Sequence, residues 1–323
     1  MNMKKRRFTG IGMLLIVLVG FAGCGQPFVS DKPIEVSGNV VDNDLNNFIA
    51  GGNLVRIGDA LYYNYNQTDA CARMKLSADG ATPDMGVTHK GFNSALGLAI
   101  MRKHQDCIVY RPSDDPLSEQ VPFVDIFFQE TDSACVYLRY KEEELPAAVD
   151  RTAALVIFEN GFETVLAEDV ILWKFYVAED TVYYFKSLGH RCELRKHDLR
   201  THTDEAVVEH AIRQVPFECF AVGSNVVFSL HNGVYLATLD EGGTLTHIKN
   251  GFTSLNVYNR LVYMAAEDGV STYDPTTGKT QVLCTRPATE CYILDDTWVY
   301  FVSDNDSLWR VSQDGRTEEH VYG

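Results

Sequence analysis

Residues 255–283 have the sequence LNVYNRLVYMAAEDGVSTYDPTTGKTQVL. Short runs of apolar, β-branched and aromatic residues alternate here with polar turn residues, and such runs favour strands. The pattern predicts four strands, over residues 255–258, 261–265, 269–273 and 280–283. No stretch of the chain shows sustained helical periodicity with caps, which argues against helical solenoids and doubly wound α/β folds.

The same pattern recurs along most of the chain, as a polar residue followed by a short run that ends in an aromatic residue. The closing aromatics are Tyr63, Tyr110, Tyr137, Tyr184, Phe228, Tyr263 and Tyr300. Six intervals cover 300 − 63 = 237 residues, or about 40 each, and a four-stranded propeller blade occupies about 40–45 residues. We therefore predict an all-β chain that forms a single β-propeller of four-stranded blades. Seven blades are favoured, six or eight are alternatives, and a sandwich or two separate β-domains is the competing architecture.

Two further echoes support the repeat. Residues 76–80 (LSADG) and 311–315 (VSQDG) are near copies, and Asp-Gly supplies the positive φ of a tight hairpin turn. Glu218-Cys219-Phe220 and Glu290-Cys291-Tyr292 are 72 residues apart, or two units of 36. The first strand of each blade lines the channel of a propeller, so Cys219, Phe220, Cys291 and Tyr292 are expected near the channel, as packing residues. The interval of only 27 residues between Tyr110 and Tyr137 predicts irregular units in the middle of the chain.

The N-terminus has the pattern of a targeting segment. Residues 1–7 carry four cations, and residues 11–23 form a nearly unbroken apolar run, too short for the roughly 20 residues that span a bilayer. Such a sequence predicts a secretory signal over residues 1–23. Phe21-Ala22-Gly23-Cys24 resembles the lipobox of bacterial lipoproteins, in which the cysteine is lipidated. Cys24 is thus the expected lipid-attachment site, with an ordinary cleaved signal or an uncleaved anchor as the alternative.

These boundaries divide the chain into a signal peptide at 1–23, a flexible tether at 24–38 and a propeller at 39–323. The expected location is the extracytoplasmic face of the cell membrane, held there through the lipid on Cys24.

Several motifs resemble the β-propeller domain named for low-density-lipoprotein-receptor-related protein 1, which is common in lipoproteins of Gram-positive anaerobes. An Asn/Gly-rich lead-in (residues 38–53) precedes a strand and then Gly58-Asp59-Ala-Leu-Tyr-Tyr63. Residues 255–263 and 307–315 repeat parts of this pattern, while a Tyr-Trp-Thr-Asp run is missing. The resemblance implies a secreted or anchored propeller and does not imply a mechanism.

The net charge of the chain limits the classes of partner that it is expected to bind. The formal charge is 28 − 44 = −16, and without residues 1–23 it is 24 − 44 = −20. So acidic a surface is repelled by phosphate backbones, and no nucleic acid is expected as a partner.

The eight cysteines do not form a metal-binding pattern. Seven remain after Cys24, and none has the close spacing of a zinc site. Most are expected to be small buried apolar residues, with a Cys284–Cys291 disulfide as the alternative.

No catalytic or cofactor motif is present, so we expect neither an enzyme nor a bound cofactor or metal. Residues 42–44 and 304–307 resemble the start of a calcium loop, but both lack its later Gly and Glu and are expected to be solvated turns. Residues 142–144, three glutamates, are expected to be a surface loop. The spacing of His190, His197, His202 and His210 does not fit a metal site.

Three functions fit these observations. The favoured one is a membrane-anchored, non-catalytic propeller that binds a protein, peptide or glycan outside the membrane. The alternatives are an assembly factor or sensor subunit of an envelope complex, and an extracellular glycan hydrolase or lyase.

Overall fold

The computed structural model describes residues 152–322 apart from 160–161, 209–211, 240–242 and 252–253. Before residue 152 it describes seven strands, at 28–30, 54–57, 60–63, 70–77, 80–90, 124–130 and 134–139, together with residues 46, 47 and 50. The predicted signal peptide and Cys24 lie outside this part of the chain. Helix is limited here to a turn at residues 46–47 and the 3-10 helix η3 (Asp304–Asp306), and neither could span a membrane.

The last three sheets each contain four antiparallel strands in chain order. The first of these sheets contains β13 (Cys219–Val222), β14 (Asn225–Leu230), β15 (Gly233–Thr238) and β16 (Leu245–Asn250). The second contains β17 (Ser254–Tyr258), β18 (Leu261–Ala266), β19 (Gly269–Asp274) and β20 (Lys279–Cys284). The third contains β21 (Glu290–Ile293), β22 (Trp298–Ser303), β23 (Ser307–Ser312) and β24 (Glu318–Tyr322). The four strands predicted within residues 255–283 are thus confirmed to within one residue at each end.

A seven-stranded sheet precedes these three and forms the middle part of the described chain. It contains β6 (Val124–Glu130), β7 (Ala134–Arg139), β8 (Thr152–Glu159), β9 (Phe162–Ala178), β10 (Thr181–Ser187), β11 (Cys192–Asp198) and β12 (Thr203–Ala206). The 17-residue β9 pairs with β8 along its first part and with β10 along its last part. It therefore serves as the fourth strand of one unit and the first strand of the next.

The first sheet has the same four-strand core with one addition. It contains β2 (Leu54–Ile57), β3 (Ala60–Tyr63), β4 (Ala70–Ser77) and β5 (Gly80–Lys90). A three-residue strand, β1 (Phe28–Ser30), pairs in parallel with β5, where Phe28 lies opposite Val87. Residues 28–30 fall within the segment expected to be a tether.

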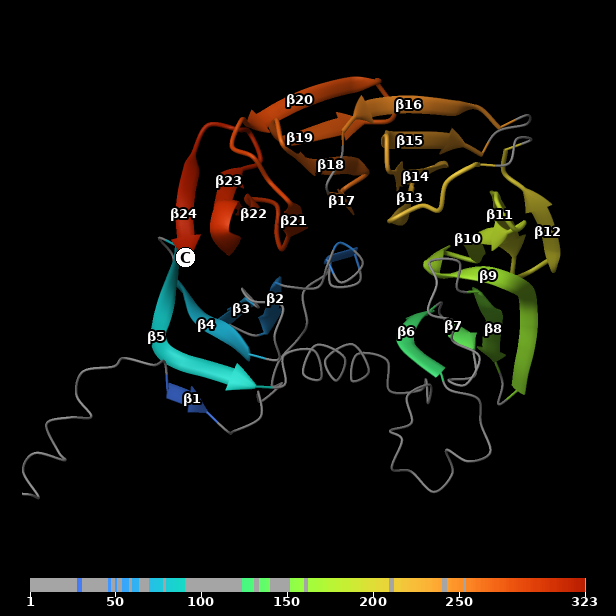
Figure 1. Cartoon of the computed structure of the whole chain (residues 1–323), viewed down its shortest axis with the longest axis horizontal. Coiled ribbons are helices and arrows are strands. Elements are labelled where there is room, and N and C mark those ends of the chain that lie inside the picture. Colours follow the sequence, from blue (N-terminus) through green and yellow to red (C-terminus); the bar gives the residue numbers. More distant parts are fainter. Residues whose placement is uncertain are drawn as a thin grey trace, which may run out of the picture.

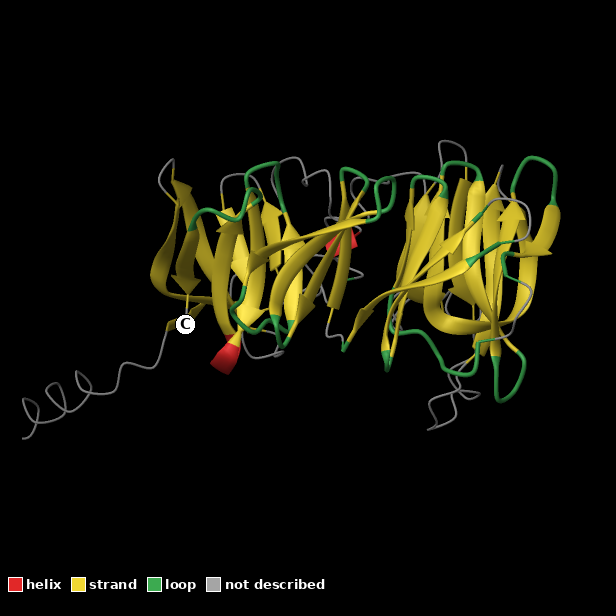
Figure 2. Cartoon of the chain, turned by 90° about the horizontal axis from the view of Figure 1, so that it is seen from above, coloured by secondary structure: helices red, strands yellow, loops and turns green. Residues whose placement is uncertain are grey.

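The sheets stand side by side around an arc (Figure 1), with their strands running roughly across the plane of the arc (Figure 2). The first strands β13, β17 and β21 lie on its inner side, and the fourth strands β16, β20 and β24 lie on its outer side. This is the arrangement of blades in a β-propeller. Counting the seven-stranded sheet as two units that share β9, the described residues contain six four-strand units.

The repeated aromatic residues mark the same place in each unit. Tyr63, Tyr137, Tyr184, Phe228, Tyr263 and Tyr300 all lie in the second strand of their unit, and none is more than 2% exposed. Large aromatic side chains at one position of every blade fill the space between neighbouring sheets. The prediction from these residues is confirmed, except that Tyr110 lies outside the described residues.

The hydrophobic core is divided into layers between adjacent sheets. One layer joins Phe185 and Leu194 to Phe228, and another joins Tyr263 and Val270 to Phe301. A third joins Leu61 of the first sheet to Tyr300 of the last one, so the first and last sheets are neighbours. Burial of these apolar faces, rather than a single central core, stabilises the arc.

Candidate functional site

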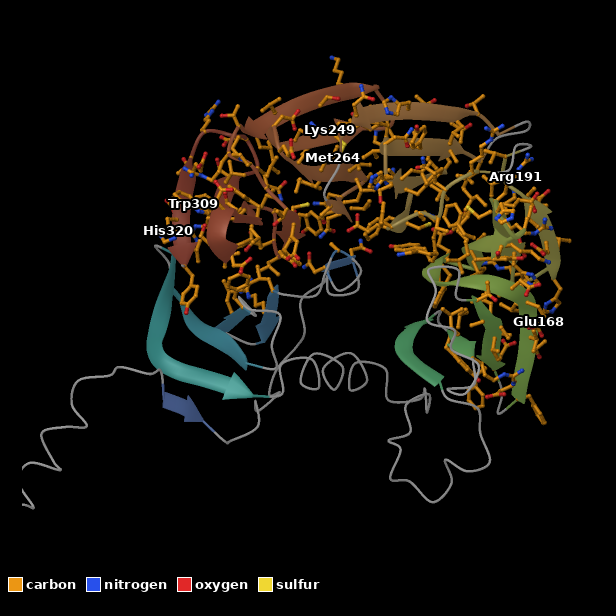
Figure 3. The ribbon with its side chains drawn as sticks, viewed as in Figure 1. Glu168, Arg191, Lys249, Met264, Trp309 and His320 are labelled. Carbon is orange, nitrogen blue, oxygen red and sulfur yellow. The ribbon has the colours of Figure 1, made fainter. Side chains whose placement is uncertain are left out.

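The inner side of the arc holds a short segment from the N-terminal part of the chain. Asn46 and Asn47 hydrogen-bond to β17 and β21, Ala50 packs in a core layer with residues of β13 and β17, and the amide of Ala50 donates to the carbonyl of Asn46. Ala50 is 2% exposed and packs in the core layer that includes Phe220 and Met264, the latter labelled in Figure 3. We call residues 46, 47 and 50 the channel segment.

Side-chain amides attach the channel segment to three inner strands. Asn46 Nδ2 donates to the carbonyl of Val257 at 2.8 Å, and Tyr176 Oη of β9 donates to Asn46 Oδ1 at 3.0 Å. Asn47 pairs with the backbone of Ile293 in β21, donating to its carbonyl at 2.8 Å and accepting from its N–H at 2.9 Å. Asn47 thus binds the β21 backbone as another strand would.

Asn256, which is fully buried in β17, joins the same network. Its Nδ2 donates to Asn47 Oδ1 at 2.9 Å and to the carbonyl of Cys291 at 3.0 Å, and its Oδ1 accepts from the Val257 N–H at 2.8 Å. Buried amides are tolerated only when they are hydrogen-bonded in this way. The network therefore has a structural role at the centre of the arc.

Four polar side chains occur where successive inner strands begin. Glu218 directly precedes β13, Ser254 begins β17, Glu290 begins β21, and Lys174 lies where β9 begins to pair with β10. Glu218 accepts hydrogen bonds from the Leu255 N–H at 2.7 Å and from the Ser254 hydroxyl at 3.3 Å. Lys174 Nζ donates to the carbonyl of Phe217. We call these four residues the polar ring.

Burial changes the acid–base properties of the polar ring. Burial raises the pKa of the Glu218 carboxyl to about 8, and the nearby Glu290 carboxylate adds to this effect. Burial also lowers the pKa of Lys174, an effect that the charge of Glu218 opposes. A carboxyl with such a pKa can hold or release a proton near neutral pH. The polar ring is therefore the best candidate for proton-dependent behaviour among the described residues.

Glu218→Gln is expected to change how stability depends on pH. The pKa of Glu218 is about 8 in the folded protein against an ordinary 4.5, so folding favours the protonated form. Its stabilising contribution is complete below pH 4.5 and is lost as the pH rises through about 8. The free energy of unfolding of the parent protein relative to Glu218→Gln should therefore fall across this window, as measured by urea titrations at several pH values.

Glu267→Gln, which removes an exposed carboxylate, is the matched control and should run parallel to the parent protein. A difference between the parent protein and Glu218→Gln that stays constant from pH 4.5 to about 8 would contradict the raised pKa.

The inner-strand residues expected near the channel are placed as packing residues. Cys219, Phe220, Cys291 and Tyr292 are all at most 2% exposed, and they belong to four different core layers between sheets. Their side chains alternate between the two faces of their strands, so they pack against the neighbouring sheets. Packing is the role expected for them.

The four cysteines with described side chains are free and buried: Cys192, Cys219, Cys284 and Cys291. Of the two alternatives, the structure therefore shows buried thiols, without a Cys284–Cys291 disulfide. Burial raises the pKa of the Cys192 and Cys219 thiols to about 12, and it raises the pKa of Cys284 and Cys291 as well.

These four thiols are expected to resist alkylation in the native protein, because the thiolate is the reactive form and the thiols are inaccessible. Iodoacetamide labelling followed by peptide mass spectrometry should find them unmodified in native buffer and modified in denaturant. Rapid labelling of Cys219 in native buffer would show that the layer between β9 and β13 opens readily.

The structure does not bring together the other residues that the sequence offered as candidates for a metal site. Residues 304–306 form the 3-10 turn η3, His197 is buried in β11, and His190 lies in the loop before β11. Within the described part of the chain, no three His, Cys, Asp or Glu side chains are grouped closely enough to hold a metal ion. Cys24, His210 and residues 42–44 and 142–144 lie outside that part.

No member of the polar ring was predicted from the sequence. Glu218 and Glu290 each begin one of the two repeated tripeptides, but the repeat was used only to place Cys219, Phe220, Cys291 and Tyr292. Ser254 lies midway between the two glutamates, 36 residues from each. That spacing could have identified Ser254 in advance. Lys174 and the amides of Asn47 and Asn256 carry no comparable signal, because their role depends on contacts between distant parts of the chain.

No protein-family model matches the chain, and no curated protein matches it. Among solved structures, it is similar to an oligogalacturonate lyase in complex with manganese (TM-score 0.46, 11% identity, covering 88% of this chain and 77% of that one). It is also similar to TolB from Acinetobacter baumannii (TM-score 0.41, 12% identity, 90% and 65% covered). A third similar structure is BamB from Moraxella catarrhalis (TM-score 0.39, 10% identity, 79% and 70% covered). These likenesses are distant, and the propeller assignment rests on the sheets of the chain itself.

Proposed function

We propose that this chain is a lipid-anchored, extracytoplasmic β-propeller that binds a protein, peptide or glycan partner without catalysing a reaction on it. The lipid is attached at Cys24, and the propeller acts on the outer side of the cell membrane. The resemblance of this chain to the β-propeller domain named for low-density-lipoprotein-receptor-related protein 1 is part of the same proposal.

The channel segment is the observation that carries the proposal. Asn46 and Asn47 lie against the inner strands, and their side-chain amides donate to the carbonyls of Val257 and Ile293. A catalytic site needs reactive groups that are free to engage a substrate. The buried amides at this position bind one another instead, which favours partner binding on the outer surfaces of the sheets.

One observation favours a protein partner, as in an assembly factor or sensor subunit of an envelope complex. Phe162 is 77% exposed and Val165 is 40% exposed, and both lie in the first part of β9, the outermost strand of its unit. The two side chains point to opposite faces of the strand, and an exposed large apolar side chain on an outermost strand, such as Phe162, is a candidate contact for a protein partner.

Anchoring is tested with Cys24→Ser in a bacterial host that lipidates exported proteins. The parent protein should incorporate labelled fatty acid and remain with the membranes, whereas Cys24→Ser should do neither. Cys107→Ser is a matched control that keeps the expected site. Equal membrane retention of Cys24→Ser without label would contradict lipid anchoring.

Partner binding is tested by cross-linking intact cells and identifying the captured molecules by mass spectrometry. A protein captured by the parent protein and lost with Phe162→Ser would support the β9 surface. Val282→Ser is the control, because Val282 is 61% exposed on β20, the outermost strand of a different unit. Wall glycan captured equally by all three proteins would favour a glycan ligand, and turnover of that glycan would contradict the non-catalytic proposal.

A further inference from the structure

A small cavity of about 190 Å³ lies at one end of the unit formed by β9–β12. Two short segments form its walls. One is the end of β10 and the loop that follows it, which contribute Ser187, Gly189, His190 and Arg191, and the other contributes Arg213, Gln214 and Val215. Ile171 of β9 completes the lining. Three basic side chains thus surround one small cavity in a protein that is strongly acidic overall.

The backbone holds the two segments together immediately beside the cavity. Cys192 and Ile212 form an isolated antiparallel bridge, in which each N–H donates to the other's carbonyl, at 2.8 and 2.7 Å. The Cys192 thiol also bonds to the carbonyl of Gln214 at 3.1 Å. Arg191 and Arg213 are the next residues outward from this bridge, one on each segment. The bridge therefore fixes two arginines on facing segments.

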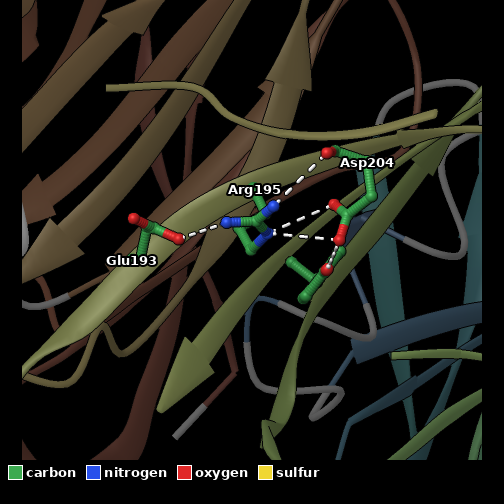
Figure 4. A network of polar contacts seen from close by, with 4 residues as sticks. Glu193, Arg195 and Asp204 are labelled. Carbon is green, nitrogen blue, oxygen red and sulfur yellow. Dashed lines mark hydrogen bonds and ion pairs between the residues drawn. The ribbon is translucent and has the colours of Figure 1, made fainter. Parts of the chain in front are cut away.

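Nothing in the described structure neutralises these two charges. Neither Arg191 nor Arg213 forms an ion pair with a described residue, and both side chains are exposed. Arg195 in the same strand as Cys192 behaves differently, because it pairs with Glu193 and with Asp204 at 3.2 Å (Figure 4). Figure 3 shows Arg191 at the end of this unit near β11 and β12.

Two like charges on facing segments repel one another and destabilise the pairing. An anion between them would remove the repulsion, and the planar guanidinium group suits carboxylate and phosphate oxygens. The size of the cavity limits the anion, since each water occupies about 30 Å³ and the cavity has room for about six. That space admits one anionic group and excludes a large ligand.

We propose that this cavity binds a small anionic group, a carboxylate or phosphate of a ligand, between Arg191 and Arg213. Ser187 and Gln214 provide additional hydrogen-bond donors in the lining, and His190 provides a further polar group. Because the surrounding protein is negatively charged, the site selects a localised anion rather than a polyanion.

The test uses inorganic phosphate and acetate as probes, with ionic strength held constant by sodium chloride. Each probe that binds should raise the Tm of the full chain in a saturable way, because it binds the folded state. Arg191→Ala and Arg213→Ala should each weaken the apparent affinity at least about tenfold. A response to phosphate alone assigns a phosphate group, and a response to acetate assigns a carboxylate.

Arg200→Ala is the matched control. Arg200 lies in the same unit, its side chain is 79% exposed, and it pairs with Asp180 away from the cavity. Without added anion, Arg191→Ala and Arg213→Ala should be at least as stable as the parent protein, since each removes a repulsion. No saturable rise in Tm with either probe, or an equal loss of affinity with Arg200→Ala, would overturn the proposal.

Discussion

Replacing Gly269 with alanine is expected to lower the free energy of unfolding by more than about 4 kcal/mol. Gly269 begins β19 with φ +116°, a conformation that L side chains rarely adopt. A Cβ there would lie 2.1 Å from the carbonyl oxygen of Cys284 and 2.8 Å from the Cα of Thr285. Both are backbone atoms of the neighbouring strand or its end, so β19 and β20 would have to separate. Urea unfolding followed by circular dichroism measures the loss.

Gly278→Ala separates the two causes of the expected loss of stability, which are the positive φ and the steric clash of the added Cβ. Gly278 also has a positive φ, +68°, but no atom lies within 4 Å of its Cβ position. Alanine there should cost only the left-handed conformation, about 1–2 kcal/mol. If the two variants were equally stable, the close approach of Gly269 to Cys284 would not be present in solution.

Asn256→Leu is expected to lower the free energy of unfolding by about 3 kcal/mol, although leucine is similar in size and more apolar. The substitution removes both hydrogen bonds that Nδ2 donates, to Asn47 Oδ1 and to the Cys291 carbonyl. It also removes the acceptor of the Val257 N–H. Buried groups that lose a partner without gaining water account for the loss. Thermal and urea unfolding would both measure it.

The partner variant Asn47→Ala tests whether the two amides act together. The double variant should lose less stability than the sum of the single variants, because they share one hydrogen bond. Asn232→Ala, which removes an exposed hydrogen bond to Tyr235, should change stability by only about 0.5 kcal/mol. Full additivity of the Asn47 and Asn256 variants would show that the channel segment is not held by Asn256.

The repeating part of the fold could be predicted from sequence because it is local. A polar turn residue and a run ending in an aromatic specify a hairpin within a few residues, as at Asn259 and Tyr263. Repetition then multiplies that weak local signal six times within the described residues. The near copies around Gly80 and Gly315 likewise mark the turn between the third and fourth strands of their units.

Features that depend on distant contacts could not be predicted in this way. The double use of β9 has no sequence signal, since one continuous strand does not show where its partners change. The cavity depends on the bridge between Cys192 and Ile212, which belong to different segments. Arg191 and Arg213 are unremarkable in sequence, and only the bridge places them face to face.

The channel segment also sets an order of events during biosynthesis. Asn47 bonds to Ile293, 246 residues later in the chain, and Asn46 bonds to Val257, 211 residues later. Contacts between residues so far apart in the sequence form slowly, because a long loop must close first. In a chain that emerges from its N-terminus, residues 46, 47 and 50 must wait for nearly the whole polypeptide before they reach their native partners. The centre of the propeller is therefore completed late, and a truncated chain that ends before β21 would leave Asn47 without its strand-like partner.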